Sequence, residues 1–296
     1  MDKLVDFNDK DKLENNQVYV NPKSSKIIDS YITFYGKNNI LFVEDGVVLK
    51  HSNILFNKDN AVIYLSKNSM PYIIDCFVNH EDCIYIGKNC YFNDVARMHL
   101  FAYECSNIVI GDDGLFSFDI WMRTSDPHLI YDVNTKERIN YSKSIFVGDH
   151  VWLGQRCMIL KGSQIGSGSV VGGGAVVSNR RIASNSVWAG NPAHLVRQNV
   201  FFSGDVVHGW SQTETKNNAR LDTDKWIYSL NENTKSMTEI DDCLRDADNA
   251  VDKLKIIQEL LVADNSKDRF YIDSNSEITK RLGFRDKIKL FTVRKK

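Results

Sequence analysis

The sequence predicts a mainly β fold in which the chain coils into a parallel β-helix, with one long loop leaving the coil and a helical extension after it. Three observations predict this. Aliphatic residues recur every six positions from Val147 to Val177. The same spacing appears upstream, between Ile86 and Met122, and is interrupted once, over about residues 123–144. After residue 198 the period ends, and apolar residues near the C-terminus recur at helical spacing.

Two series of residues share the six-residue period. The first series consists of aliphatic residues, namely Val147, Leu153, Ile159, Ile165, Val171 and Val177. The second series lies four residues later and is made of small or aliphatic residues, namely Val151, Cys157, Ser163, Ser169 and Ala175. An α-helix would scatter such positions around its axis, and an isolated strand would alternate at every second residue. A six-residue unit fits a short strand plus a tight corner, so that three units make one triangular coil.

Glycines follow four of the six aliphatic residues directly, at Gly148, Gly154, Gly166 and Gly172. We expect them at corners where the backbone adopts a positive φ, which glycine tolerates without steric cost. The small residues of the second series would let the chain bend at each corner.

The upstream part of the chain sets the domain boundaries. Ile86, Phe92 and Met98 keep the spacing of six, as do Ile110, Phe116 and Met122. Met122 and Val147 are 25 residues apart, one residue out of phase, which indicates an excursion near 123–144. Residues 36–80 have an irregular period and are interpreted as early coils, after an irregular lead-in over 1–35. The predicted β-helix domain is therefore 36–198, and 199–296 forms a C-terminal extension.

Composition excludes several classes of protein. The 296 residues include 43% hydrophobic ones, enough for one large domain or two. The 38 acidic and 37 basic side chains nearly cancel, whereas a nucleic-acid-binding protein would have a basic excess. The N-terminus shows no apolar signal region, no run of 18 apolar residues occurs, and the six cysteines form no CxxC pair. We therefore expect a cytoplasmic protein with free thiols.

The motifs HVWLG, ILKG, GGGAVV and AGNPAHLV resemble those of the left-handed β-helix acyltransferases that use acetyl-CoA. The longer string DPHLIYD…ERIN…VGDHVWLGQRCMILKG resembles the bacterial capsule and sialic-acid O-acetyltransferases of that family. The resemblance covers roughly residues 36–200. It implies a left-handed coil, a homotrimer with active sites between neighbouring subunits, acetyl-CoA as co-substrate, and no metal.

The excursion carries the candidate catalytic base. Transfer of an acetyl group to a hydroxyl requires a group that removes the hydroxyl proton, and histidine titrates near neutral pH. A loop that leaves the coil would project His128 into the cleft formed with the next subunit. Asp126 or Asp132 would orient the imidazole through its other nitrogen, with Asp126 preferred, although a backbone carbonyl would also serve.

The resemblance also implies a donor-binding set. Trp152, on an outward position beside Leu153, is expected near the thioester, both as a catalytic residue that donates its indole N–H and as a surface that flanks the pantetheine arm. The other implied donor-binding residues are Gln155, Gly173, Ser178, His194 and Arg197. His194 stands where many relatives have a basic residue, and Arg197 suits phosphate oxygens better; Arg180 and Arg181 are alternative phosphate partners. Asn93 is a candidate on the acceptor side.

The C-terminal extension contains one predicted helix. Residues 239–263 place Ile240, Leu244, Val251 and Leu254 on one apolar stripe, with Thr238 as the expected N-cap, and we expect this helix to dock on the coil or on a partner subunit. The tail from residue 280 to 296 has eight basic residues and one acidic one. This tail suggests contact with an anionic polymer or the inner membrane surface, or simply a solvated segment.

The sequence therefore predicts an O-acetyltransferase acting on a sugar of a bacterial surface glycan, capsular or lipopolysaccharide. The first alternative is acetylation of a small molecule, such as a hexose, serine or a xenobiotic. The second is a β-helical zinc hydratase using His99, His128 and His150, although these lack the close histidine pair that such a site needs. The third is a sugar-binding β-helix without catalysis.

Overall fold

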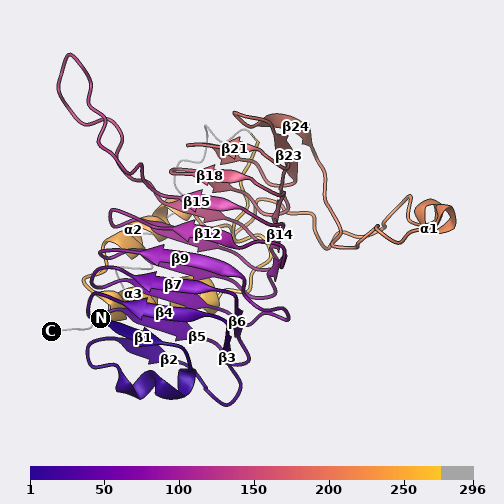
Figure 1. Ribbon diagram of the computed structural model, residues 1–296. Helices are drawn as coiled ribbons and strands as arrows, with labels where there is room; N and C mark the ends of the chain where they lie inside the picture. Colours follow the sequence, from indigo (N-terminus) through magenta and orange to yellow (C-terminus); the bar gives the residue numbers. More distant parts are fainter. Residues whose placement is uncertain (275–296) are drawn as a thin grey trace.

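The computed structural model describes residues 1–274, which form a three-sided parallel β-helix with two projecting segments and a helical C-terminal extension (Figure 1). Most coils contribute one strand to each of three faces, and equivalent strands of successive coils pair in parallel; the coil of β7 and β8 has only an isolated bridge, at Tyr72, on the third face. Among the strands of residues 1–274, only β1 with β4 and β23 with β24, at the two ends, pair antiparallel. The predicted β-helix is therefore confirmed.

The strands of each face follow one another up the coil. Face 1 consists of β1 (Asp2–Leu4), β4 (Tyr31–Phe34), β7 (Asn53–Phe56), β9 (Ile74–Val78), β12 (Met98–Phe101), β15 (Trp121–Arg123), β18 (Met158–Leu160) and β21 (Val176–Val177). Face 2 consists of β2 (Gln17–Tyr19), β5 (Ile40–Val43), β8 (Val62–Leu65), β10 (Cys83–Ile86), β13 (Asn107–Ile110), β16 (Ile145–Val147), β19 (Gln164–Ile165) and β22 (Arg181–Ile182). Face 3 begins with the pair β3 (Lys26–Ile28) and β6 (Val48–Lys50) and continues with β11 (Tyr91–Phe92), β14 (Leu115–Phe116), β17 (Trp152–Leu153), β20 (Val170–Val171), β23 (Ser186–Ala189) and β24 (His194–Gln198).

The core of the coil is built from the periodic residues. All six members of the aliphatic series and all five members of the second series are at most 1% exposed. Each aliphatic residue packs on its equivalent one coil away, as Ile159 pairs with Met122 below and Val177 above. Burying a side chain of this size contributes about 1.5–3 kcal/mol, so the repeated stack supplies much of the stability of these coils.

The glycines of the repeat serve close packing of successive coils. None of Gly148, Gly154, Gly166 and Gly172 has a positive φ, so the expectation for them was wrong. A Cβ on Gly154 would lie 2.5 Å from the backbone nitrogen of Gly173 in the next coil. Real Cβ atoms do not approach that closely, so the spacing between coils requires glycine at this position.

The coil begins earlier than the sequence predicts. The segment assigned as an irregular lead-in over 1–35 contains β2, β3 and β4, which already pair with the next coil. Ile32 pairs with Ile54, 22 residues later, whereas Ile159 pairs with Val177, 18 residues later. The longer corners of the early coils displace the six-residue period, which hid these coils in the sequence. The 3-10 helix Phe7–Lys12 places Phe7 in the core at this end.

The C-terminal extension covers the outer side of face 2. The single helix expected over 239–263 is divided into α2 (Met237–Arg245), α3 (Ala250–Ile257) and a π-helical turn (Gln258–Val262). The expected cap at Thr238 was also wrong, because Ser236 caps α2 and Asn249 caps α3. The expected docking on the coil is confirmed through a cluster that joins helical residues to outward residues of face 2, namely Met237, Ile240, Leu244, Leu254 and Ile257 with Val62, Tyr64, Tyr85, Val109 and Phe146.

A second projecting segment, residues 203–225, leaves the coil after β24 and carries the short helix α1 (Gln212–Asn217), which buries no residue (Figure 1). The ring of His150 packs against both ends of this segment. Its centroid lies 4.0 Å from that of the Phe202 ring and 3.6 Å from that of the Trp226 ring. Within residues 1–274, no helix has the length and apolar character needed to cross a membrane. The basic tail at 280–296 lies outside the described residues.

Candidate active site

The excursion predicted near 123–144 leaves face 1 after β15 and returns to face 2 at β16. It projects outward from the corner between these two faces as a long hairpin-like loop (Figure 1). Most of its residues are exposed, but its two ends are held by buried polar groups at the corner.

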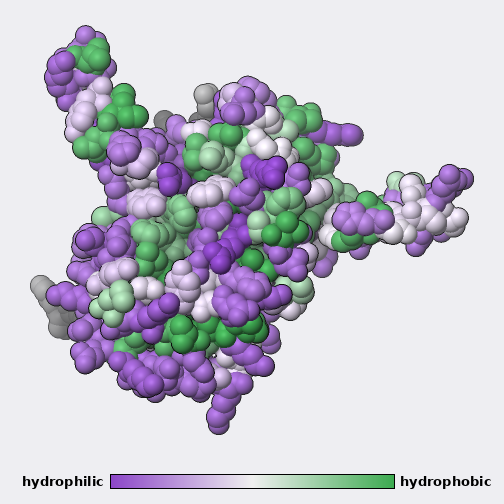
Figure 2. Space-filling view, in the orientation of Figure 1, coloured by the Kyte–Doolittle hydropathy of each residue, from purple (hydrophilic) through white to green (hydrophobic). Residues whose placement is uncertain are grey.

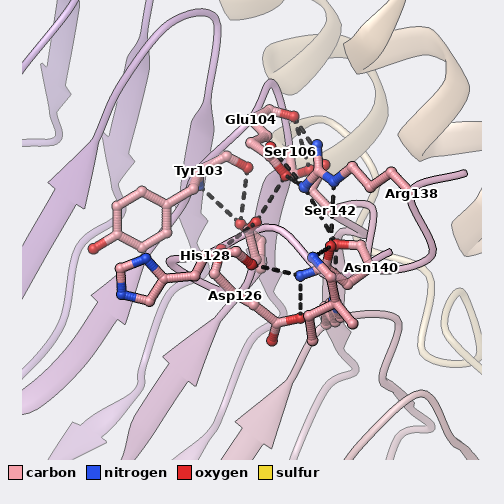
Figure 3. A network of polar contacts seen from close by, with 12 residues as sticks. Tyr103, Glu104, Ser106, Asp126, His128, Arg138, Asn140 and Ser142 are labelled. Carbon is pink, nitrogen blue, oxygen red and sulfur yellow. Dashed lines mark hydrogen bonds and ion pairs between the residues drawn. The ribbon is translucent and has the colours of Figure 1, made fainter. Parts of the chain in front are cut away.

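Glu104 holds the two ends of the excursion together. The Oγ of Ser125, near the first end, donates to the Glu104 carboxylate at 2.7 Å, and Arg138, on the returning half of the excursion, forms an ion pair with it at 2.8 Å. Near the second end, Ser142 donates to the backbone oxygen of Glu104 at 3.0 Å. Arg138 and Ser125 also lower the pKa of Glu104 below its usual range, outweighing its desolvation. These contacts form the polar network in Figure 3.

Asn140 fixes the backbone around His128. Its Nδ2 donates to the backbone oxygen of His128 at 2.7 Å and to the Asp126 carboxylate at 3.0 Å. Its Oδ1 accepts from the backbone nitrogen of Ile130 at 2.9 Å. The side chain of Asn140 is buried, with 6% of its surface exposed. It therefore fixes the backbone of the candidate base, His128, and of Ile130, two residues further along the chain. The sequence motif ERIN contains Asn140, but its residue type alone did not reveal this role.

The imidazole of His128 is exposed and points away from the polar network, on the same side as the Tyr103 ring (Figure 3). The Asp126 carboxylate does not contact that ring; it accepts from Lys161 Nζ at 2.5 Å, and this bond is the main reason why the pKa of Asp126 is lowered. Asp132 caps its own turn by accepting from the backbone nitrogens of Asn134 and Thr135. In this structure Asp126 therefore acts on the excursion through Asn140 and Lys161.

Three of the residues expected to bind the donor lie together on face 3 and the corner that follows it. Trp152 on β17 is 39% exposed, and its ring lies 5.8 Å from that of Phe202. Gln155, in the next turn, accepts through its backbone oxygen from Gly174 of the following coil at 2.8 Å. Gly173 is exposed beside it. Asn93 lies at the same corner in a lower coil, where its side chain caps a turn at Val95.

The remaining donor candidates are more dispersed. His194 and Arg197 are exposed on β24, which pairs antiparallel with β23 at the end of face 3. Ser178 lies at the corner between faces 1 and 2, above the excursion and away from Trp152. Within one chain, His128 and Trp152 therefore project from different sides of the prism, and the chain alone does not bring them together.

The other histidines considered do not form a metal centre with His128. His99 on β12 bonds to Asp75 at 3.1 Å and stacks on Trp121, while His150 is buried at the corner between faces 2 and 3. Burial lowers the pKa of His150 to about 4, so it is neutral at physiological pH. In the part of the chain that the structure describes, no three His, Cys, Asp or Glu side chains are grouped to hold a metal ion.

Comparisons with known proteins agree with this architecture. Residues 144–179 match the family described as bacterial transferase hexapeptide (six repeats). A polysialic acid O-acetyltransferase of Neisseria meningitidis is 36% identical over 178 residues, which are 60% of this chain and 81% of that protein. A polysialic acid O-acetyltransferase of Escherichia coli O1:K1 / APEC is 42% identical over 97 residues, 33% of this chain and 31% of that protein.

Two crystal structures of acetyltransferases share the fold. The polySia-specific acetyltransferase NeuO has a TM-score of 0.56 at 27% identity, over 68% of this chain and 91% of that one. The polysialic acid O-acetyltransferase OatWY has a TM-score of 0.56 at 25% identity, over 69% of this chain and 95% of that one. The β-helix is left-handed, as the hexapeptide repeat implies. The chain therefore belongs to the family of the polysialic acid O-acetyltransferases, which are hexapeptide-repeat acyltransferases.

Proposed function

We propose that this protein transfers an acetyl group from acetyl-CoA to a hydroxyl of an anionic bacterial surface polysaccharide, with His128 as general base. The observation that carries the proposal is the excursion itself, in which Asn140 fixes the backbone at His128 while the imidazole stays exposed. The acceptor class is supported by the relatives, which are named polysialic acid O-acetyltransferases.

In the proposed reaction, the acceptor hydroxyl attacks the thioester carbonyl while His128 takes the hydroxyl proton. The tetrahedral intermediate then collapses and expels the thiolate of CoA, which receives the same proton from the imidazolium. One acetyl group moves from sulfur to oxygen, and no residue of the chain is acylated. Asp126 and Asn140 are positioning residues in this scheme, because they act on the excursion and not on the reacting atoms.

The donor would lie along face 3. The exposed indole of Trp152 offers an apolar surface near the thioester, and a Cβ on Gly174 would meet no atom within 4 Å, so the backbone beside Gly173 is open to a ligand. The pantetheine amides would pair with backbone groups near Gln155 and Gly173. Arg197, exposed on β24, would contact phosphate, with His194 beside it and Ser178 as a weaker candidate. Asn93 would line the acceptor side.

We propose that a second copy of the chain completes the site in a homotrimer. His128 and Trp152 project from different sides of one prism, so the excursion of one subunit would reach face 3 of its neighbour. The excursion also exposes apolar side chains, including Leu129 at 57%, Val133 at 76% and Ile139 at 61%. Figure 2 shows apolar patches on this projecting segment. Contact with a neighbour would cover these residues.

Since acetyl-CoA is a cytoplasmic metabolite, we place the reaction in the cytoplasm. Contact of residues 280–296 with the inner membrane surface stays a prediction.

The decisive experiment is mass spectrometry of oligosialic acid after incubation with the protein and acetyl-CoA. A gain of one acetyl group per modified residue is expected, and His128→Ala should reduce the rate by about 10²–10⁴-fold. His80→Ala, which removes another exposed histidine, is the matched control and should leave the rate unchanged. A panel with free hexoses, serine and a xenobiotic tests the small-molecule alternative. Full activity of His128→Ala would refute its role as the base.

A further inference from the structure

A group of aromatic and cationic side chains lies on the outer side of face 1, directly below the excursion. It consists of His99 and Phe101 on β12, Tyr103 just after it, and Trp121 and Arg123 on β15. We call this group the Arg123 platform. All five residues are partly exposed, and the helices α2 and α3 lie on the other side of the coil, against face 2 (Figure 1). Figure 2 shows this side of the molecule open to solvent, with apolar patches between polar ones.

Ring contacts hold the platform in one arrangement. His99 stacks on Trp121 with ring centroids 4.0 Å apart, and Phe101 meets Trp121 edge-on at 5.5 Å. The Arg123 guanidinium lies 5.7 Å from the Phe101 ring and 5.7 Å from the Tyr103 ring. These contacts orient the guanidinium without neutralising its charge, since aromatic faces attract cations only weakly at partly exposed sites.

The carboxylates around the platform are bound by other partners. Asp75 pairs with Arg97 at 3.2 Å and with His99 at 3.1 Å. Glu104 and Asp126 are paired with Arg138 and Lys161, as described above; the Asp126 carboxylate feels the charge of Arg123 but is bonded to Lys161. Among residues 1–274, no carboxylate forms a salt bridge with Arg123. The guanidinium also bonds to the Tyr103 side chain, which leaves the other donors of its fork available to an anionic ligand.

The platform is connected to the candidate base. Thr124, the residue after Arg123, donates to the backbone oxygen of Tyr103 at 3.1 Å and accepts from its backbone nitrogen at 2.8 Å. Ser125 is then tied to Glu104, and the chain reaches His128 three residues later. Figure 3 shows the Tyr103 ring and the His128 imidazole projecting on the same side of this network. A sugar on the platform would therefore be near the path to the base.

We propose that Arg123 binds the carboxylate of the acceptor sugar while Phe101, Tyr103 and Trp121 provide the surface on which the sugar rings lie, so that the enzyme selects acidic over neutral glycans. This inference rests on the proposed function and adds the residues that determine acceptor class. A sialic acid polymer carries one carboxylate per residue, which matches a single oriented guanidinium beside aromatic rings. Asp126 and His99 face the same region, but both are engaged with other groups.

The test compares Arg123→Gln with the wild type on two probes, oligosialic acid and the same oligomer with its carboxyl groups reduced to alcohols. For the acidic probe, the KM of the variant should rise about tenfold to a hundredfold, the range expected from loss of charge-assisted hydrogen bonds. The KM for acetyl-CoA should not change. On the reduced probe, the wild type and the variant should have the same KM. Arg123→Lys should restore part of the preference for the acidic probe, and Arg220→Gln, at an exposed arginine paired with Asp222, is the matched control.

Several results would overturn the inference. An unchanged KM for oligosialic acid in Arg123→Gln would do so, as would an equal rise of KM on both probes, which indicates a structural effect. A change of oligomeric state in the variant, measured by light scattering, would show that the platform is a subunit contact. If the wild type transfers no acetyl group at all, the proposed function fails, and calorimetric binding of oligosialic acid to the wild type and to Arg123→Gln still decides the role of Arg123.

Discussion

Replacing Arg269 by methionine should destabilise the protein strongly, because this arginine joins the C-terminal extension to the coil through a buried ion pair. Its side chain is 2% exposed. Its Nη2 and Nε donate to the two carboxylate oxygens of Asp149 at 2.7 and 2.9 Å, and Nη2 also contacts Asp112 at 3.0 Å. Nη1 donates to the backbone oxygens of Leu261 and Asp264.

The magnitude follows from what remains after the substitution. Methionine fills much of the space but leaves the carboxylate of Asp149 buried without its cation. Breaking a buried pair in this way costs about 3–5 kcal/mol. At about 2–4 °C for each kcal/mol in a chain of this size, the melting temperature should fall by roughly 6–20 °C.

The pH dependence gives a second, independent readout. Burial raises the pKa of Asp149, and Arg269 opposes that rise, so the substitution should raise this pKa further. A carboxyl group with a raised folded-state pKa is destabilising while ionised and is relieved when it gains a proton as the pH falls. The loss of stability should therefore be smaller at pH 5 than at pH 8.

Thermal unfolding of Arg269→Met and wild type at both pH values is the assay. The control is Arg220→Met, at an exposed arginine whose side chain is 82% accessible and paired with Asp222, where less than about 0.5 kcal/mol is expected. A shift in Arg269→Met no larger than in the control, or a loss that grows as the pH falls, would refute the reasoning.

Three further predictions concern the core, the excursion and one buried histidine. Ile159→Ala should lower the free energy of unfolding by about 2–5 kcal/mol in urea titrations, and Met158→Ala, on the exposed side of the same strand at 42%, should cost much less; equal costs would contradict the inward assignment. Asn140→Ala should lower kcat for acetyl transfer about tenfold with the KM for acetyl-CoA unchanged, and an unaffected kcat would remove Asn140 from the mechanism. The pKa of His150 is lowered to about 4 by burial, so the unfolded chain takes up the proton first and stability should fall between about pH 6.5 and pH 4; His150→Gln should flatten that fall in melting temperature.

The sequence by itself determined the fold class and the place of the excursion. In a β-helix, residues one coil apart occupy equivalent environments. The buried positions therefore recur at a regular interval, and the apolar residues at these positions can be recognised from the sequence alone. This is why Val147 to Val177 identified the coil and why the break after Met122 located the excursion carrying His128. The apolar stripe of the C-terminal extension also recurs regularly, at helical spacing, and could be predicted. The break between α2 and α3 depends on the cap at Asn249.

Tertiary structure decided what depends on contacts between distant residues. The first coil strands, β2, β3 and β4, were hidden because longer corners shift the period, whereas residues 36–80 were expected to form coils. Asn140 contacts the backbone of His128, 12 residues away, and Arg269 pairs with Asp149, 120 residues away. The Arg123 platform joins residues up to 24 positions apart. Hydrogen bonds and ion pairs need a specific geometry, which residue type and spacing do not encode. The sequence placed His128 and Trp152 in an active site between neighbouring subunits, and the coil showed that they project from different sides of one prism.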